Sequence, residues 1–99
     1  METSFLDLFG GNPRAKVLDF FMENDIFDYS KKQVSELSGV AFNSLEKSWN
    51  NLIEFEIIKK TRKVGKSEMY IINKENEVVK CLLKIDKELA LRNLEKNKE

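Results

Sequence analysis

The chain has 99 residues, about two-fifths of them hydrophobic and one-third charged, which indicates one globular domain near the lower end of the usual size range. It contains no histidine and one cysteine, which removes the usual zinc sites, catalytic triads and disulfides, so we expect neither an enzyme nor a cofactor. No apolar run reaches the roughly 20 residues of a membrane span, and no signal-peptide pattern begins the chain. We therefore expect a cytoplasmic protein with no membrane partner.

The N-terminal part of the chain predicts a short helical turn followed by a longer helix. Residues 1–11 carry four large apolar side chains before a Gly-Gly pair, which is typical of a docked turn that glycines end. Asn12-Pro13 then predicts a helix start, because Asn is a good N-cap and Pro loses no needed N–H at the first helical position. Apolar residues at helical spacing make this first long helix mostly buried as far as residues 23–25.

A short extended piece over residues 26–29 leads to a second helix. Ser30 and Gln33 form a capping-box pattern at its start. Val34 and Leu37 are the expected core positions. Gly39 suits the left-handed residue that follows a helix, so we expect the second helix to end there.

The third helix is predicted from Asn43, with Asn43 as the N-cap and Glu46 completing the capping box. Leu45, Trp49, Leu52 and Ile53 lie at spacings that place them on one apolar face, so we assign Trp49 to the core. Two helices joined by a short turn that contains glycine are a helix-turn-helix signature.

Two strands joined at Val64-Gly65-Lys66 are predicted next, and their turn is rich in cations. Residues 1–58 carry five basic and ten acidic side chains, whereas residues 59–99 carry twelve basic and seven acidic ones. A basic hairpin on an acidic chain indicates local contact with a polyanion. The clustered cations are Lys59, Lys60, Arg62, Lys63 and Lys66.

The longest helix is predicted from residue 76 or 77 to about Leu94, with a polar tail over residues 95–99. Val78, Leu82, Ile85 and Leu89 follow a coiled-coil-like spacing, and a small domain has little core left to cover them. We therefore favour residues 1–75 as the domain body and residues 76–99 as a dimerisation element; the alternative is that this helix packs back on its own domain. Val79, Leu83 and Leu91 widen the apolar surface, and the apolar pattern around Cys81 predicts a buried structural thiol.

The order of these elements is that of a winged helix-turn-helix domain, an α+β class that is mainly α. The chain resembles the small archaeal winged-helix transcriptional regulators over about residues 5–92. That likeness implies a homodimeric DNA-binding regulator, with the third helix in the major groove and the basic hairpin, the wing, on the backbone or minor groove. The resembling stretches are Leu6–Gly10, Pro13–Phe21, Tyr29–Ser30, Leu37–Ala41 and Leu52–Lys66.

Six residues of the third helix are candidates for contact with base edges. Asn bonds bidentately to adenine, Phe touches the thymine methyl, and Lys reaches guanine or a phosphate. The alternative is an ordinary solvated helix face, with Asn43 only a cap and Phe42 in the core. The candidates are Phe42, Asn43, Ser44, Lys47, Ser48 and Asn51.

In the wing, Arg62, Lys63 and Lys66 are candidates for phosphate or minor-groove contact. The alternative is a hairpin kept soluble by lysines on an edge strand. Basic residues at the starts of the first two long helices are further candidates for backbone contact, although solvated surface charge explains them equally well. They are Arg14, Lys16, Lys31 and Lys32.

We therefore predict a dimeric regulator that binds double-stranded DNA, with no obvious small-molecule effector. The alternative is a winged-helix module for protein–protein interaction that does not bind DNA. The acidic N-terminal half and Glu46 favour that alternative, because a carboxylate near DNA is repelled by phosphate, although Glu also accepts a hydrogen bond from cytosine N4.

Overall fold

The computed structural model describes residues 3–96, so the predicted polar tail beyond Lys96 lies outside the described residues. The chain is mainly helical, with a small antiparallel sheet in the strand order β1-β3-β2. The predicted class is confirmed, including the long C-terminal helix. The elements are α1 (Ser4–Phe9), α2 (Pro13–Glu23), β1 (Tyr29–Ser30), α3 (Lys31–Ser38), α4 (Phe42–Glu54), β2 (Ile58–Val64), β3 (Ser67–Ile72) and α5 (Glu77–Lys96).

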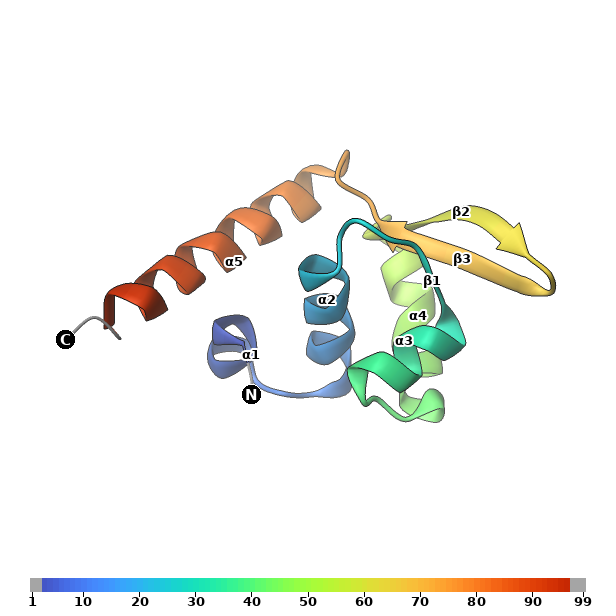
Figure 1. Ribbon diagram of the computed structural model, residues 1–99, viewed down its shortest axis with the longest axis horizontal. Helices are drawn as coiled ribbons and strands as arrows, with labels where there is room; N and C mark the ends of the chain where they lie inside the picture. Colours follow the sequence, from blue (N-terminus) through green and yellow to red (C-terminus); the bar gives the residue numbers. More distant parts are fainter. Residues whose placement is uncertain (1–2, 97–99) are drawn as a thin grey trace.

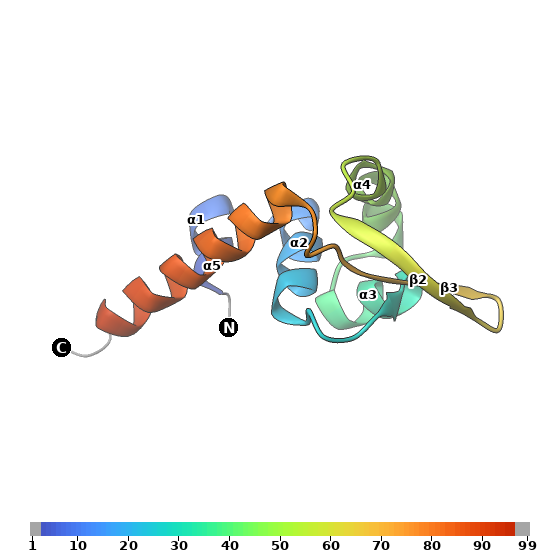
Figure 2. The same ribbon diagram turned by 90° about the horizontal axis from the view of Figure 1, so that it is seen from above.

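The helices α2, α3 and α4 form a compact body from which two elements project in opposite directions. The β2–β3 hairpin extends from one end of this body and α5 from the other, in both views (Figures 1 and 2). The short helix α1 lies between α2 and α5 and buries Phe5 and Leu6. None of the helices between residues 3 and 96 combines the length and apolar character that a membrane span requires.

Local sequence signals set most helix ends as predicted. The Asn12 side chain accepts a hydrogen bond from the Ala15 N–H at 2.9 Å, which caps α2. Ser30 and Gln33 form the predicted capping box at the start of α3. Gly39 ends α3 with a φ of 74°, a left-handed conformation that favours glycine.

The start of α4 differs from the prediction. The helix begins at Phe42, and its N-cap residue is Ala41, which offers no side-chain hydrogen bond. The predicted cap by Asn43 is therefore wrong. Glu46 does not complete a capping box either, because it is the fifth residue of α4 and not the third. Its carboxylate accepts a hydrogen bond from Lys31 Nζ at 3.1 Å instead.

The core lies where α2, α3 and α4 meet the sheet, and Trp49 is inside it as predicted. Leu37 and Ile53 are not in the core, since their exposed fractions are 63% and 40%. The two residues lie about 60° and 80° around their helices from Val34 and Leu45, beyond the width of the buried stripes. The fully buried side chains are Val17, Phe21, Val34, Leu45, Trp49, Ile72 and Val79.

Helix α5 has two apolar stripes with different surroundings. Val79 is fully buried, and Leu82 and Leu83 pack against the core of the domain. Val78 and Ile85 are exposed, and so is Cys81, which corrects the predicted buried thiol. Cys81 is exposed because it lies two positions, about 200°, around the helix from Val79, on the stripe that faces away from the core.

We predict that Leu45→Ala lowers the free energy of unfolding by about 3 kcal/mol, because a fully buried side chain leaves a cavity. The matched change Leu37→Ala should stay within about 0.5 kcal/mol, because Leu37 is mostly exposed. Urea unfolding at neutral pH measures both. Equal losses would contradict the assignment of Leu37 to the surface.

Candidate nucleic-acid interface

Helix α4 is oriented by its buried stripe, which decides which residues face outward. Leu45, Trp49 and Leu52 are buried, so the opposite side of the helix is exposed. Trp49 contacts both neighbouring elements, with ring centroids 5.8 Å from Phe21 of α2 and 5.2 Å from Tyr70 of β3. The outward face is therefore fixed relative to both the helical body and the wing.

The six residues predicted to face the groove divide into three groups. Phe42, Asn43 and Lys47 are exposed. Ser44 and Asn51 are half-buried on the flank next to the body. Ser48 is only 5% exposed, so it does not protrude far enough to reach a base edge.

Asn50 is an exposed residue that the sequence prediction missed. It lies seven positions after Asn43 and three after Lys47, on the same side of the helix. The signal was present in the sequence, because these positions are opposite the Leu45–Trp49–Leu52 stripe. The exposed polar face of α4 is therefore formed by Asn43, Lys47 and Asn50.

The charge of Glu46 is compensated within the domain. Its carboxylate lies 3.1 Å from Lys31 Nζ, and the same ammonium group lies 5.7 Å from the centroid of the Trp49 ring. The negative charge of Glu46 is therefore neutralised by Lys31. A DNA phosphate near this position would meet an ion pair and not an isolated carboxylate, so Glu46 is a weaker obstacle to DNA binding than the sequence indicates.

The wing ends in a two-residue turn, and Gly65 provides the positive φ of 60° that such a turn requires. Lys66 is the second residue of this turn and Lys63 lies just before it, and both are exposed. Neither forms an ion pair with an acidic residue of the described chain, so both charges face solvent. Lys60, by contrast, is bound to Glu68 at 3.2 Å.

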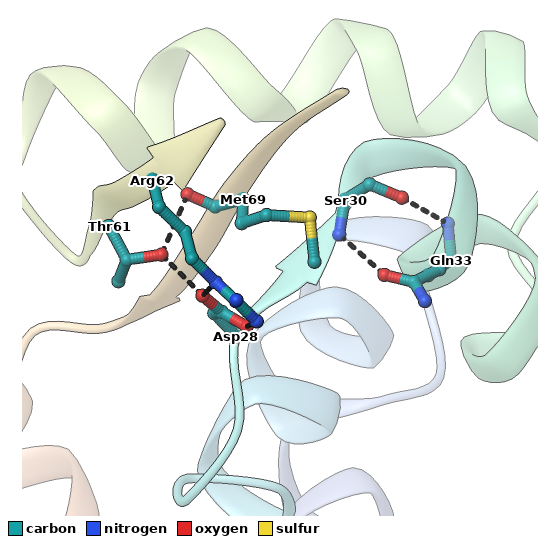
Figure 3. A network of polar contacts seen from close by, with 6 residues as sticks. All are labelled: Asp28, Ser30, Gln33, Thr61, Arg62 and Met69. Carbon is teal, nitrogen blue, oxygen red and sulfur yellow. Dashed lines mark hydrogen bonds and ion pairs between the residues drawn. The ribbon is translucent and has the colours of Figure 1, made fainter. Parts of the chain in front are cut away.

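Arg62 is held by an acidic side chain from the loop before β1. Its Nε and one terminal nitrogen donate to the two oxygens of Asp28 at 2.9 and 3.1 Å, a bidentate pair (Figure 3). The guanidinium thus has an internal partner, unlike Lys63 and Lys66. No local pattern in the sequence predicts this pair, because its members lie 34 positions apart.

Thr61 belongs to the same network and marks a β-bulge. The pairing of β2 with β3 moves from Lys60 opposite Tyr70 to Arg62 opposite Met69, so Thr61 is the extra residue. Its hydroxyl donates to Asp28 Oδ2 at 2.6 Å (Figure 3). Asp28 thereby ties the bulge to the loop before β1 and sets the direction in which the wing leaves the body.

The wing and α4 meet at a shared groove of 340 Å³. Phe42 comes from α4, Lys32 from α3, and Lys66 and Tyr70 from the wing, so the three elements present one continuous surface. The groove is lined by three lysines, two aromatic side chains and one carboxylate. Its lining is Ser30, Lys31, Lys32, Phe42, Lys66, Ser67, Glu68 and Tyr70.

Three carboxylates gather away from this surface, between α2 and α5. Oxygens of Asp19, Glu23 and Asp86 lie within 4.8 Å of one another, and the Thr3 hydroxyl donates to Asp19 at 2.9 Å. Burial, reinforced by the charge of Asp86, raises the pKa of both Asp19 and Glu23. Hard cations favour oxygen ligands of this kind, but such clusters also occur without an ion.

Comparisons with known proteins support the fold. No family model matches the chain, and no curated protein matches it. A homodimeric winged helix-turn-helix DNA-binding domain from Mycobacterium bovis, described as a possible ArsR-family transcriptional regulator, aligns with a TM-score of 0.60 and 16% identity, over 93% of this chain and 80% of that one. A mutant of Lactococcus lactis ZitR in its apo form aligns with a TM-score of 0.63 and 17% identity, over 95% of this chain and 74% of that one. At these identities the likeness establishes the winged-helix fold.

The Asp28–Arg62 pair predicts a pH dependence of stability. Hydrogen bonds from Arg62 and then Thr61 lower the pKa of Asp28 to about 2. A lowered carboxyl pKa stabilises the fold at pH values above the unfolded pKa of about 3.9, and this contribution is lost as the pH falls towards 2. Asp28→Asn should therefore lower the free energy of unfolding at pH 6, and its difference from the wild type should disappear near pH 2.

Urea unfolding between pH 6 and pH 2.5, together with an NMR titration of the Asp28 carboxyl carbon, measures this effect. A stability difference that is the same at every pH, or a carboxyl midpoint near 4, would contradict the proposed pair.

Proposed function

We propose that this protein is a homodimeric transcriptional regulator that binds double-stranded DNA. The observation that carries this proposal is the surface on which the exposed face of α4, the start of α3 and the tip of the wing meet. Phe42 and Lys66 line one groove there although they come from α4 and the wing, so one DNA duplex can contact both elements. In this proposal α4 enters the major groove, and the wing lies on the backbone or minor groove.

Base readout would come from the exposed side of α4. Asn43 and Asn50 carry amides that match the donor and acceptor pattern of adenine, and Lys47 can reach guanine. Phe42, which is 44% exposed at the first position of α4, can touch a thymine methyl. Asn51 and Ser44 lie on the flank and would contribute less, and Ser48 is excluded from base contact by its burial.

The electrostatic contact of the wing would come from Lys63 and Lys66. Each phosphate that a cation neutralises adds about 0.9 to the slope of log K against log salt. Arg62 would act mainly through Asp28, by holding the wing in place, and not as a phosphate ligand. So few charges in one subunit favour a dimer that places two wings on the DNA.

The proposed dimer uses the outward stripe of α5, which leaves residues 1–75 as the DNA-binding body and residues 76–99 as the dimerisation element. Cys81, Ile85 and Leu89 border an apolar groove of 350 Å³ on this helix, and Val78 extends the same stripe. Leu82 belongs partly to the domain's own core, so Cys81 replaces it in the proposed seam. The Mycobacterium bovis domain with the same fold is described as homodimeric, which supports this arrangement.

A winged-helix module that binds another protein is the second candidate. It is favoured by large apolar side chains on the loop between α2 and β1, where Ile26 and Phe27 are 76% and 67% exposed. Exposed apolar side chains of this size are more typical of a protein interface than of a DNA-binding surface. An enzyme is disfavoured because the chain has no histidine and no nucleophile–base pair.

Fluorescence anisotropy against the DNA upstream of the protein's own gene and against a scrambled duplex, at two salt concentrations, tests DNA binding. We expect tighter, salt-sensitive binding to the upstream DNA. Lys63→Ala and Lys66→Ala should each reduce the salt slope by about 1.8, because the dimer loses one phosphate contact in each of its two subunits. The matched control Lys87→Ala, on α5, should leave the slope unchanged. Absence of binding to either duplex at low salt would overturn the proposal in favour of a protein partner.

Ile85→Glu should convert the proposed dimer into a monomer, because it places a charge in the apolar stripe of α5. Sedimentation equilibrium measures the mass directly. Leu91→Glu is the matched control, since Leu91 is also exposed but lies about 120° around the helix from Ile85. A wild-type protein that sediments as a monomer, or equal effects of the two variants, would rule out this seam.

A further inference from the structure

A second groove opens on the other flank of α4, between this helix and the start of α2. It has a volume of 500 Å³ and receives Ser44, Lys47 and Ser48 from α4. Ser44 lies about 160° around the helix from Phe42, so this groove and the wing groove border opposite sides of the exposed face. The complete lining is Asn12, Pro13, Arg14, Ser44, Lys47 and Ser48.

The charge of this groove is entirely positive. Arg14 and Lys47 are exposed, and neither forms an ion pair with any acidic residue between positions 3 and 96. No carboxylate borders the groove, whereas Glu68 borders the wing groove. An anionic ligand would therefore meet two uncompensated cations and no repelling group.

Ser48 adds a hydroxyl to the lining of this groove. The exposed fraction of Ser48 is only 5%, yet the residue lines the groove. Its hydroxyl makes no hydrogen bond to any residue of the described chain. The buried polar side-chain atom that lacks a partner within residues 3–96 is Trp49 Nε1, so the Ser48 hydroxyl is the accessible end of a mostly buried side chain. The hydroxyl is thus available to donate to a ligand in the groove.

The first turn of α2 adds a backbone donor. Asn12 accepts from the Ala15 N–H through its side chain and from the Lys16 N–H through its carbonyl, and Pro13 has no N–H. The Arg14 N–H has no acceptor within residues 3–96. The start of this 11-residue helix also carries the partial positive charge of the helix dipole.

We propose that this groove binds a phosphate of the DNA backbone. Arg14 and Lys47 supply charge, and the Ser48 hydroxyl and the Arg14 N–H supply hydrogen bonds. This inference rests on the proposed function and changes the role of three residues, since Ser44, Lys47 and Ser48 face the backbone and not the bases. A helix in the major groove has a phosphate strand on each side, so the α2 groove would contact the strand opposite the one near the wing.

The test is the salt dependence of DNA affinity for Arg14→Gln, Ser48→Ala and the control Lys16→Gln. Arg14→Gln should weaken binding to all duplexes roughly tenfold and reduce the salt slope by about 1.8, because the dimer loses one phosphate contact in each subunit. Ser48→Ala should weaken binding several-fold without changing the slope, because a hydroxyl carries no charge. Lys16 was a sequence candidate for backbone contact, but the structure places it beside Asp19, Glu23 and Leu37, on the side of α2 that faces α3. Lys16→Gln therefore removes a charge from the same helix away from the groove, and it should retain the wild-type slope.

Ethylation interference identifies the phosphate itself. Ethylation of one backbone phosphate should impair the wild type but not Arg14→Gln, which has already lost that contact. Circular dichroism verifies that each variant is folded.

The outcomes separate this inference from the proposed function. If Lys66→Ala lowers the salt slope and Arg14→Gln does not, the protein binds DNA but the α2 groove does not contact a phosphate. That result would overturn the inference and leave the proposed function standing. If the wild type binds no duplex at low salt, both proposals are overturned. If inorganic phosphate at matched ionic strength stabilises the wild type but not Arg14→Gln, while the DNA slope is unchanged, the groove takes a free anion and the inference is overturned.

Discussion

The burial of Trp49 is the constraint on which the arrangement of this protein depends. Its indole lies between Phe21 of α2 and Tyr70 of β3, so one side chain joins the helical body to the wing through α4. Because Leu45 and Leu52 continue the same stripe, α4 cannot rotate without exposing apolar surface. The direction of its polar face, and the distance from that face to the wing tip, follow from this packing.

Internal ion pairs reduce the number of charges available to a ligand. Arg62 is bound to Asp28, Lys60 to Glu68 and Lys31 to Glu46, so the cluster of cations seen in the sequence overstates the positive charge of the wing. The cations that face solvent at the proposed interface include Lys63 and Lys66 on one flank of α4 and Arg14 and Lys47 on the other. This distribution of cations fits contact with both strands of a duplex. Asp28, which binds Arg62 and Thr61, has the separate role of positioning the bulged strand β2.

The sequence predicted those features that depend on neighbouring residues. The caps at Asn12 and Ser30, the left-handed Gly39 and the core position of Trp49 each follow from a pattern within one or two helical turns. Features that depend on distant residues were missed. The Asp28–Arg62 pair joins residues 34 positions apart, and the exposure of Cys81 depends on which stripe of α5 faces the domain. Within α4, the stripe of apolar residues was identified but its width was overestimated, so Ile53 was assigned to the core and Asn50 was overlooked.

The most direct test of this account is the amide chemical-shift perturbation of the isotope-labelled protein on addition of the DNA upstream of its own gene. The account predicts shifts on the exposed face of α4, at the wing tip around Gly65 and at the start of α2, with the outward stripe of α5 unchanged. Shifts confined to α5 or to the apolar loop between α2 and β1, or no shifts at all, would contradict it.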